Sequence, residues 1–423
     1  MAAGKRIAFV NPPRVKEGFI EAEDCCWGAS SKLVLPAMLL SCASQIKDAI
    51  FIDLAIDNLN DLKILSPDII VIPLAWQYHR ETYNTMAQFC SQNGIQLVVI
   101  AVPPGYVQDY AMLEPNPHMV VYSEPETVFK DWADHEFSDE WKYDPANSGI
   151  AYYSSGIVTL RGIRDCEFDK IGRTNYAWLV HPHYRDRYRV AVVQATRGCP
   201  YRCHFCVWGG STITDKSFKM RNPKVVADDL KAVWKILNQK FIYLLSAQLT
   251  TNLDWIKEFH KNMVGSGVQF QSNVRINEVT DEKLKLLSES GMTNTSVGVE
   301  ALTDKLLLRL KKGYDMETVK KGLVIMDNSG IPYHVHLRLG YGETVEEIAE
   351  VHKSLDELAK LNLKNMRADL GPLIFYKGTV YGDNHPCESV PSPNYTENCP
   401  MMKGIPREWN AIGQRLIEMG WIG

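Results

Sequence analysis

Short apolar runs in the first third of the chain are continuous rather than alternating, a pattern typical of strands that are covered on both faces. These runs lie at residues 7–10, 49–53, 69–74, 97–102 and 119–122. Between them, apolar positions recur at helical spacing, which predicts helices over residues 33–46, 80–93 and 126–132. This repeated order predicts an α/β fold with a Rossmann-like, doubly wound parallel sheet, in which ligands bind beyond the carboxyl ends of the strands.

A second series of alternating elements begins near residue 188. We interpret the preceding stretch, 136–187, as a linker that wraps around the protein, because it keeps too many aromatic residues for a disordered tether. Strands are then expected at residues 190–195, 241–245, 269–273, 293–297, 333–339 and 366–370. One of the helices between them begins with Asn222 as its cap and Pro223 in its first turn. Six such units predict a partial (β/α)6 barrel of the TIM type, with its chemistry on the loops after the strands.

These patterns divide the chain into four parts. The Rossmann-like domain covers residues 1–135, the wrapping linker 136–187, the barrel 188–371, and a short C-terminal cap 372–423. The cap ends in an amphipathic helix, predicted over residues 407–419, and we expect it to cover the mouth of the barrel.

The composition is that of an ordinary globular protein. Of the 423 residues, 45% are hydrophobic and 23% are charged, and the net charge is -4. No basic excess favours nucleic acid, and the apolar stretches are too short for a signal peptide or a membrane span. We therefore expect a cytoplasmic protein without nucleic-acid or membrane partners.

Three cysteines gather in the sequence "RGCPYRCHFC", directly after the first strand of the second series: Cys199, Cys203 and Cys206. A structural zinc site takes a closed set of four ligands, so three thiols without a nearby fourth indicate a metal centre with an open position. Their offsets suit three corners of a cubane iron–sulfur cluster whose fourth iron has no protein ligand. The alternative is a zinc site completed by a distant histidine, for which the candidates are His181, His183 and His204.

The other cysteines do not show paired ligand spacing. Cys42 and Cys90 lie among helix-like apolar neighbours and are expected in the core. The rest lie in loop-like sequence and are interpreted as ordinary thiols: Cys25, Cys26, Cys166, Cys387 and Cys399.

The spacing C-x3-C-x-aromatic-C, with Phe205 in the aromatic position, resembles the signature of the radical S-adenosylmethionine enzymes. Later segments are similar to the same family in the same order: "QSNVRINEVTDEKLKLLSESG", "TSVGVEA" and "LRLGYGETVEE". The resemblance implies a [4Fe-4S] cluster on the three cysteines, with S-adenosylmethionine bound to the open iron. It further implies one-electron cleavage of the sulfonium to a 5′-deoxyadenosyl radical, inside a barrel that excludes water.

The resemblance also implies positions for S-adenosylmethionine at successive strand ends. These are Phe205 in the cysteine loop, Ser246 and Gln248 after the second strand, Asn273 and Arg275 after the third, Glu300 after the fourth and Arg338 after the fifth. Arg would suit a carboxylate and Glu an ammonium group; the alternative for each residue is a structural polar side chain. Two features depart from the family pattern: "LLSAQLTTN" carries no acidic residue, and Tyr341 stands where proline is usual.

The first domain resembles the cobalamin-binding subclass of this superfamily. "RIAFVNPP", "SPDIIVIPLAWQ" and "HMVVYSEPETVFKDW" are similar to its first, third and fifth strands with their loops. The resemblance implies cobalamin near residues that follow strands: Pro12, Trp76, Gly105, Ser123 and Glu124. The sequence lacks D-x-H-x-x-G and replaces the usual glycine pair with Val102-Pro103-Pro104-Gly105. Trp76 could cover the cobalt or pack in the core, and the domain could be an empty scaffold.

These likenesses favour a cobalamin-dependent methyltransferase that acts on an unactivated carbon of a small metabolite or natural-product intermediate. The expected partners are that small-molecule substrate and an external electron donor such as flavodoxin or ferredoxin. One alternative is a radical enzyme without cobalamin that performs cyclisation, oxidation or rearrangement. The other is a non-catalytic iron–sulfur protein.

Overall fold

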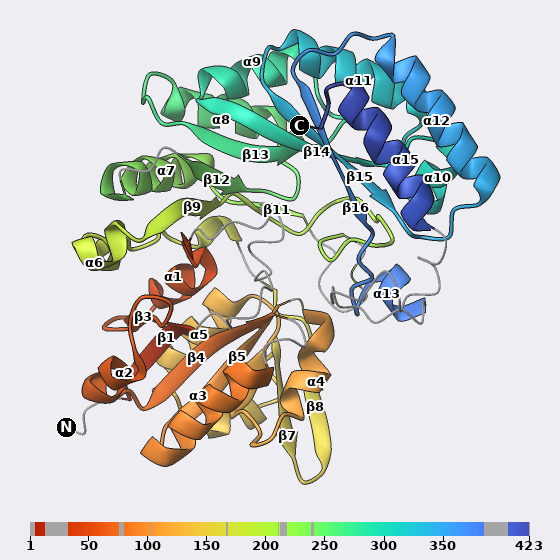
Figure 1. Ribbon diagram of the computed structural model, residues 1–423. Helices are drawn as coiled ribbons and strands as arrows, with labels where there is room; N and C mark the ends of the chain where they lie inside the picture. Colours follow the sequence, from red (N-terminus) through yellow and green to blue (C-terminus); the bar gives the residue numbers. More distant parts are fainter. Residues whose placement is uncertain are drawn as a thin grey trace. The chain divides into compact units, whose positions relative to one another are not determined.

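The computed structural model of the chain describes residues 5–12, 33–75, 80–102, 104–165, 168–209, 211, 218–237, 241–384 and 405–422. It contains two compact α/β units, the first formed mainly by residues before 193 and the second mainly by residues after 192 (Figure 1). The finer division of the chain into linker and cap stays a prediction.

The first sheet has the strand order β3-β1-β4-β5-β6-β7-β8. Its parallel part confirms the five strands expected from continuous apolar runs: β1 (Ile7–Asn11), β3 (Ile50–Asp53), β4 (Ile69–Ala75), β5 (Gln96–Val102) and β6 (Met119–Val121). The chain order reverses between β1 and β4, which both pair with parallel neighbours. This is the flavodoxin-like order, and its crevice lies beyond the carboxyl ends of these two strands.

The sheet is mixed rather than wholly parallel, because an unexpected antiparallel hairpin extends it. β7 (Ile150–Ser154) pairs with β6 and with β8 (Ile157–Arg161). Both strands come from the stretch interpreted as a wrapping linker. The hairpin is tied down by Gly149, whose carbonyl oxygen accepts hydrogen bonds from the N–H groups of Tyr122 and Ser123.

The helices of the first unit are α1 (Ala37–Ala43), α2 (Leu59–Leu65), α3 (Arg80–Asn93), α4 (Val107–Ala111), α5 (Pro125–Asp134) and α6 (Pro182–Arg185). The helix expected from residue 33 begins only at Ala37, after Pro36. Proline disfavours the α conformation in the residue before it, and Leu33–Val34 instead form the short strand β2. Asn58 begins α2 with a complete capping box.

The second sheet has the strand order β16-β15-β14-β13-β12-β9-β2. All six expected barrel strands are present: β9 (Tyr188–Gln194), β12 (Ile242–Leu245), β13 (Phe270–Val274), β14 (Met292–Glu300), β15 (Tyr333–Leu339) and β16 (Met366–Pro372). Within the described residues the order is open, which makes this a partial barrel. A short hairpin, β10 (Thr196–Arg197) with β11 (Lys219–Met220), follows β9.

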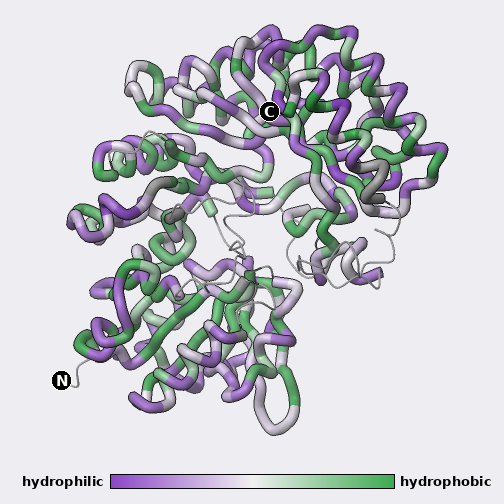
Figure 2. Tube along the Cα trace, in the orientation of Figure 1, coloured by the Kyte–Doolittle hydropathy of each residue, from purple (hydrophilic) through white to green (hydrophobic). Residues whose placement is uncertain are grey.

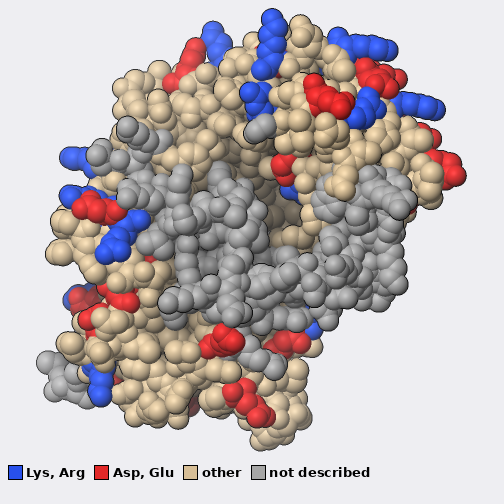
Figure 3. All heavy atoms as spheres, in the orientation of Figure 1, with Lys and Arg blue, Asp and Glu red and all other residues tan. Residues whose placement is uncertain are grey.

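Helices alternate with these strands. They are α7 (Pro223–Leu237), α8 (Leu253–Met263), α9 (Asp281–Glu289), α10 (Asp304–Arg309), α11 (Met316–Asn328), α12 (Val345–Ala359), α13 (Val380–Asn384) and α15 (Ile405–Glu418). On the face seen in Figure 3, basic and acidic side chains are interspersed over the helices of this unit rather than separated by sign. Among the described residues, no helix combines the length and the hydropathy that a membrane span requires.

The two sheets differ in how their strands are buried. β5 is buried or half-buried along its whole length, whereas residues alternate between buried and more exposed along β13 and β15. Figure 2 shows the same contrast, with hydrophobic colour along β4 and β5 and mixed colour along β13. The second sheet therefore presents one polar face, unlike the apolar interior of a filled barrel, and this face positions the candidate site.

Candidate functional site

The three predicted ligands lie on one compact loop after β10. Cys203 is only 6% exposed, and the N–H of Cys206 donates to its carbonyl oxygen over 3.1 Å. Arg202 braces the loop by donating from Nη1 to the carbonyl oxygen of Cys199 over 3.0 Å. Gly209 closes it, because a Cβ there would overlap the carbonyl oxygen of Tyr201 and lie 3.2 Å from the Cβ of Cys199.

Two thiols of this loop have raised pKa values. Burial raises the pKa of Cys199 and raises that of Cys206 to about 12, and Cys203 adds to both shifts. A raised pKa favours the protonated thiol, whereas a bound metal favours the thiolate. Three soft donors with these properties fit an iron–sulfur cluster, in which each thiolate binds a different iron.

The zinc alternative requires four ligands around one ion. Among the described residues, no three His, Cys, Asp or Glu side chains are grouped so as to hold a single metal ion. Two of the candidate histidines make hydrogen bonds to other residues, and the third, His204, lies within the cysteine loop near Tyr381. Nε2 of His183 lies 2.7 Å from Oδ1 of Asp57, Nδ1 of His181 accepts from the N–H of His183, and the His204 ring lies 6.2 Å from that of Tyr381.

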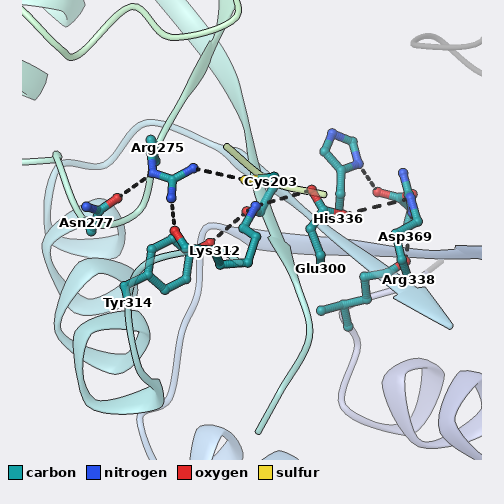
Figure 4. A network of polar contacts seen from close by, with 11 residues as sticks. Cys203, Arg275, Asn277, Glu300, Lys312, Tyr314, His336, Arg338 and Asp369 are labelled. Atoms are coloured by element: carbon teal, nitrogen blue, oxygen red, sulfur yellow. Dashed lines mark hydrogen bonds and ion pairs between the residues drawn. The ribbon is translucent and has the colours of Figure 1, made fainter. Parts of the chain in front are cut away.

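Arg275 points directly at the cysteine loop (Figure 4). Its Nη1 donates to Sγ of Cys203 over 3.8 Å, and its Nε donates to Oδ1 of Asn277 over 2.8 Å. The guanidinium carbon lies 3.6 Å from the ring centre of Tyr201 and 5.0 Å from that of Tyr314. The side chain is thus held on several sides.

Lys312 is a second buried cation at this place, and the sequence pattern did not single it out. Its Nζ donates to the carbonyl oxygen of Gly298 over 2.7 Å and lies 5.7 Å from the ring centre of Phe205. Burial alone would lower the pKa of Lys312, but the nearby Tyr314, Glu300 and Cys203 raise it above its ordinary value.

A chain of charges continues across the ends of β14, β15 and β16. Glu300 lies 3.7 Å from Nζ of Lys312 and 3.9 Å from Nε of Arg338. Arg338 in turn donates to Oδ2 of Asp369 over 2.7 Å, and the other oxygen of that carboxylate pairs with Nδ1 of His336. Burial would raise the pKa of Asp369, but the hydrogen bond from His336 and the charge of Arg338 lower it to about 2.

The candidates after β12 lie beside the cysteine loop but are committed to internal contacts. Oγ of Ser246 lies 3.0 Å from Oγ1 of Thr196 and accepts from the N–H of Gln248. Nε2 of Gln248 donates to Glu278 over 2.5 Å, and Glu278 also accepts from the hydroxyl of Tyr201. Sequence reasoning missed Glu278, although it stands three residues after Arg275 in a family-like segment.

Asn273 is the remaining candidate on the polar face. It is half-buried in β13 and pairs in register with Ser296 of β14. The structure thus brings Phe205, Arg275, Glu300 and Arg338 into one network beside Cys203. Gln248 contacts Glu278, which joins this network through Tyr201. Ser246 accepts a hydrogen bond from the N–H of Gln248.

The segment after β16 packs on the cysteine loop. The N–H of Tyr381 donates to the carbonyl oxygen of His204 over 3.0 Å, and Ser211 forms a β-bridge with Thr379. Part of the C-terminal region therefore covers this loop. α15 packs on β16, and its Arg415 contacts the carbonyl oxygen of His352 on α12.

The cobalamin candidates lie along one edge of the first sheet. Pro12 is buried directly after β1, and Gly105 is buried in a short 3-10 turn (Pro104–Tyr106) after β5. Ser123 and Glu124 follow β6. The N–H of Ser123 donates to the carbonyl oxygen of Gly149, and the backbone of Glu124 adopts a left-handed conformation before α5. Trp76 lies outside the described residues. In the loop after β6, the backbone N–H of Ser123 is already used by the hairpin and is not available to a ligand.

Parts of this sequence are similar to those of known proteins. The pattern of the Radical SAM superfamily matches residues 193–355. The chain is 28% identical over 174 residues to an anaerobic magnesium-protoporphyrin IX monomethyl ester cyclase of Rubrivivax gelatinosus, covering 39% of this chain and 30% of that protein. It is 24% identical over 289 residues to bacteriochlorophyllide d C-12(1)-methyltransferase of Chlorobaculum tepidum, covering 68% of this chain and 59% of that protein.

Among solved structures, the cobalamin-dependent S-adenosylmethionine radical enzyme OxsB, with aqua-cobalamin and S-adenosylmethionine bound, has the same fold. The TM-score is 0.71 at 15% sequence identity, covering 90% of this chain and 60% of that one. The chain thus spans less than two thirds of the length of each of these three proteins.

Proposed function

Because residues 193–355 match the Radical SAM superfamily and the fold matches that of a cobalamin-dependent radical enzyme, we propose that this chain is a cobalamin-dependent methyltransferase acting on an unactivated carbon of a small molecule. The observation that carries this proposal is the cysteine loop after the first strand of a partial barrel, with Cys203 buried and Cys199 and Cys206 half-buried, in a chain that also contains a flavodoxin-like sheet.

Cys199, Cys203 and Cys206 would hold a [4Fe-4S] cluster and leave one iron open. With S-adenosylmethionine bound there, the cluster supplies the electron that generates a 5′-deoxyadenosyl radical. The chain itself orients the reacting groups and excludes water. Tyr381 and the bridge between Ser211 and Thr379 cover the loop, which suits the shielding of a reactive carbon radical.

Glu300 and Arg338 are the proposed contacts for the amino and carboxylate groups of S-adenosylmethionine. They carry the required opposite charges and lie on adjacent strands of the polar face. Gly298 leaves room for this arrangement, because a Cβ there would overlap the carboxylate of Glu300. Asn273 on the neighbouring strand and Phe205 in the cysteine loop are proposed to contact the rest of the molecule. Ser246 and Gln248 would shape the site through Glu278 instead.

Cobalamin would bind at the carboxyl edge of the first sheet, near Pro12, Trp76 and Gly105, and supply the methyl group. Ser123 and Glu124 would contribute fewer contacts, because the hairpin already occupies that loop. The bacteriochlorophyllide methyltransferase, aligned with 68% of this chain, supports methyl transfer. An external electron donor of the flavodoxin or ferredoxin kind is part of this proposal.

A cyclisation is the second candidate function, favoured by the likeness to the magnesium-protoporphyrin IX monomethyl ester cyclase. That alignment covers 39% of this chain, less than the alignment with the methyltransferase. The test is to purify the protein anaerobically from cells supplied with cobalamin and to measure iron, cobalt and the visible spectrum. Cobalt and iron bound together support methyl transfer, whereas a full iron content without corrinoid would favour the cyclisation.

A further inference from the structure

The guanidinium group of Arg275 is oriented by contacts that do not involve a bound molecule. Nε donates to Asn277 over 2.8 Å, and Nη2 donates to the carbonyl oxygen of Lys312. The guanidinium carbon lies over the ring of Tyr201, 3.6 Å from the ring centre. The remaining terminal nitrogen, Nη1, is thereby aimed at Sγ of Cys203, 3.8 Å away (Figure 4).

Lys312 adds a second positive charge beside the same loop. Its side chain is 5% exposed, and its Nζ lies 5.7 Å from the ring centre of Phe205. The carboxylate of Glu300 lies 3.7 Å from Nζ of Lys312 and balances its charge only in part. The same carboxylate also pairs with Arg338, whose Nε lies 3.9 Å away. Two cations thus stand close to the cysteine loop, one of them in contact with a thiol.

We infer that Arg275 and Lys312 set the reduction potential of the iron–sulfur cluster by placing positive charge and an N–H···S hydrogen bond against Cys203. The inference rests on the proposed function, since it needs a cluster on the three cysteines. Arg275 acts through Cys203, so it is a positioning residue, and this role differs from the contact with S-adenosylmethionine implied by family resemblance.

The electrostatic argument is simple. Three thiolates bring three negative charges to a loop beside the buried Arg275 and Lys312, and one electron from a low-potential external donor adds another. Buried charges are weakly screened, so nearby cations lower the free energy of the reduced state more than that of the oxidised state. Charge and hydrogen bonds to sulfur are among the factors that set the potentials of these clusters. Arg275 and Lys312 therefore make one-electron reduction easier.

The experiment measures the midpoint potential of the full-length, reconstituted protein by following the EPR signal of the reduced cluster during an anaerobic redox titration. Arg275→Gln removes both the charge and the hydrogen bond. At the wild-type midpoint potential we expect this variant to show a ratio of reduced to oxidised cluster at least about tenfold lower. This corresponds to a midpoint potential that is lower by about 59 mV for one electron. Arg275→Lys keeps the charge, so a smaller shift in the same direction is expected.

Arg415→Gln is the matched control, because it removes one positive charge from the same unit at a surface pair with Asp356. We expect no shift in this variant. An unchanged potential in Arg275→Gln with full iron content would overturn the inference. Equal shifts in Arg275→Gln and Arg415→Gln would overturn it as well, since net charge alone would then account for the effect.

If Arg275→Gln fails to retain iron, Arg275→Lys and Lys312→Met decide the question. Lower potentials in both support the inference, and wild-type potentials in both overturn it. These outcomes differ from a failure of the proposed function, in which the wild-type protein itself would assemble no [4Fe-4S] cluster, as judged from its spectrum and iron content.

Discussion

Tyr188, at the start of β9, donates its hydroxyl hydrogen to Oδ2 of Asp53, at the end of β3, over 2.6 Å. Asp53 is fully buried and also accepts hydrogen bonds from Asn11 and from the N–H of Ala55. A buried carboxylate is costly unless it is hydrogen-bonded, so these three donors keep it in place. The contact ties Tyr188 to the end of β3 within the first unit.

Replacing Tyr188 with Phe should therefore destabilise the protein, because it leaves a buried carboxylate oxygen without its donor. We expect the free energy of unfolding to fall by about 1.5–3 kcal/mol, the range for hydrogen bonds to charged groups. Urea unfolding at neutral pH, followed by circular dichroism, measures this. Tyr153→Phe, at an exposed position on β7, is the control and should change stability little. Equal stability of the two variants would contradict this role of Tyr188.

Gly209 should be required for assembly of the metal site. A Cβ at this position overlaps the carbonyl oxygen of Tyr201, so Gly209→Ala must displace the backbone that carries Cys199 and Cys203. We expect severalfold less iron per chain after anaerobic reconstitution. Gly172→Ala is the control, because a Cβ there meets nothing within 4 Å. Normal iron content in Gly209→Ala would show that the loop is less tightly closed than described.

His118 should make the first unit sensitive to acid. Burial and the charge of Lys142 lower the pKa of His118 to about 4, while Asp139 opposes them in part. Nζ of Lys142 also lies 3.3 Å from Nδ1 of His118, so a proton on Nδ1 would remove that hydrogen bond. Between pH 6.5 and 4 the unfolded chain therefore takes up a proton that the folded chain does not, and stability falls as pH falls.

The expected loss over this range is about 2–3 kcal/mol, from the size of the shift in pKa. Urea unfolding of the metal-free protein at several pH values measures it. His118→Gln should flatten the dependence on pH, whereas His135→Gln, at an exposed position, should leave it unchanged. A wild-type dependence on pH in His118→Gln would show that another group titrates.

The sequence was sufficient for the features that depend on local pattern. Continuous apolar runs predicted β1, β4 and β5 because both faces of these strands are covered, and the spacing of the three cysteines depends on adjacent residues alone. Features that depend on contacts between residues far apart in the sequence were not predicted. Lys312 meets the cysteine loop only once β14 and α10 are folded, and the β7–β8 hairpin follows β6 across an irregular segment.

The central claim is tested most directly by incubating the reduced, reconstituted protein with S-adenosylmethionine and measuring 5′-deoxyadenosine. We expect the wild-type protein and Cys90→Ala, a core control, to form it, and Cys203→Ala to form none. Formation of 5′-deoxyadenosine by Cys203→Ala at the wild-type rate would contradict the assignment of this cysteine loop.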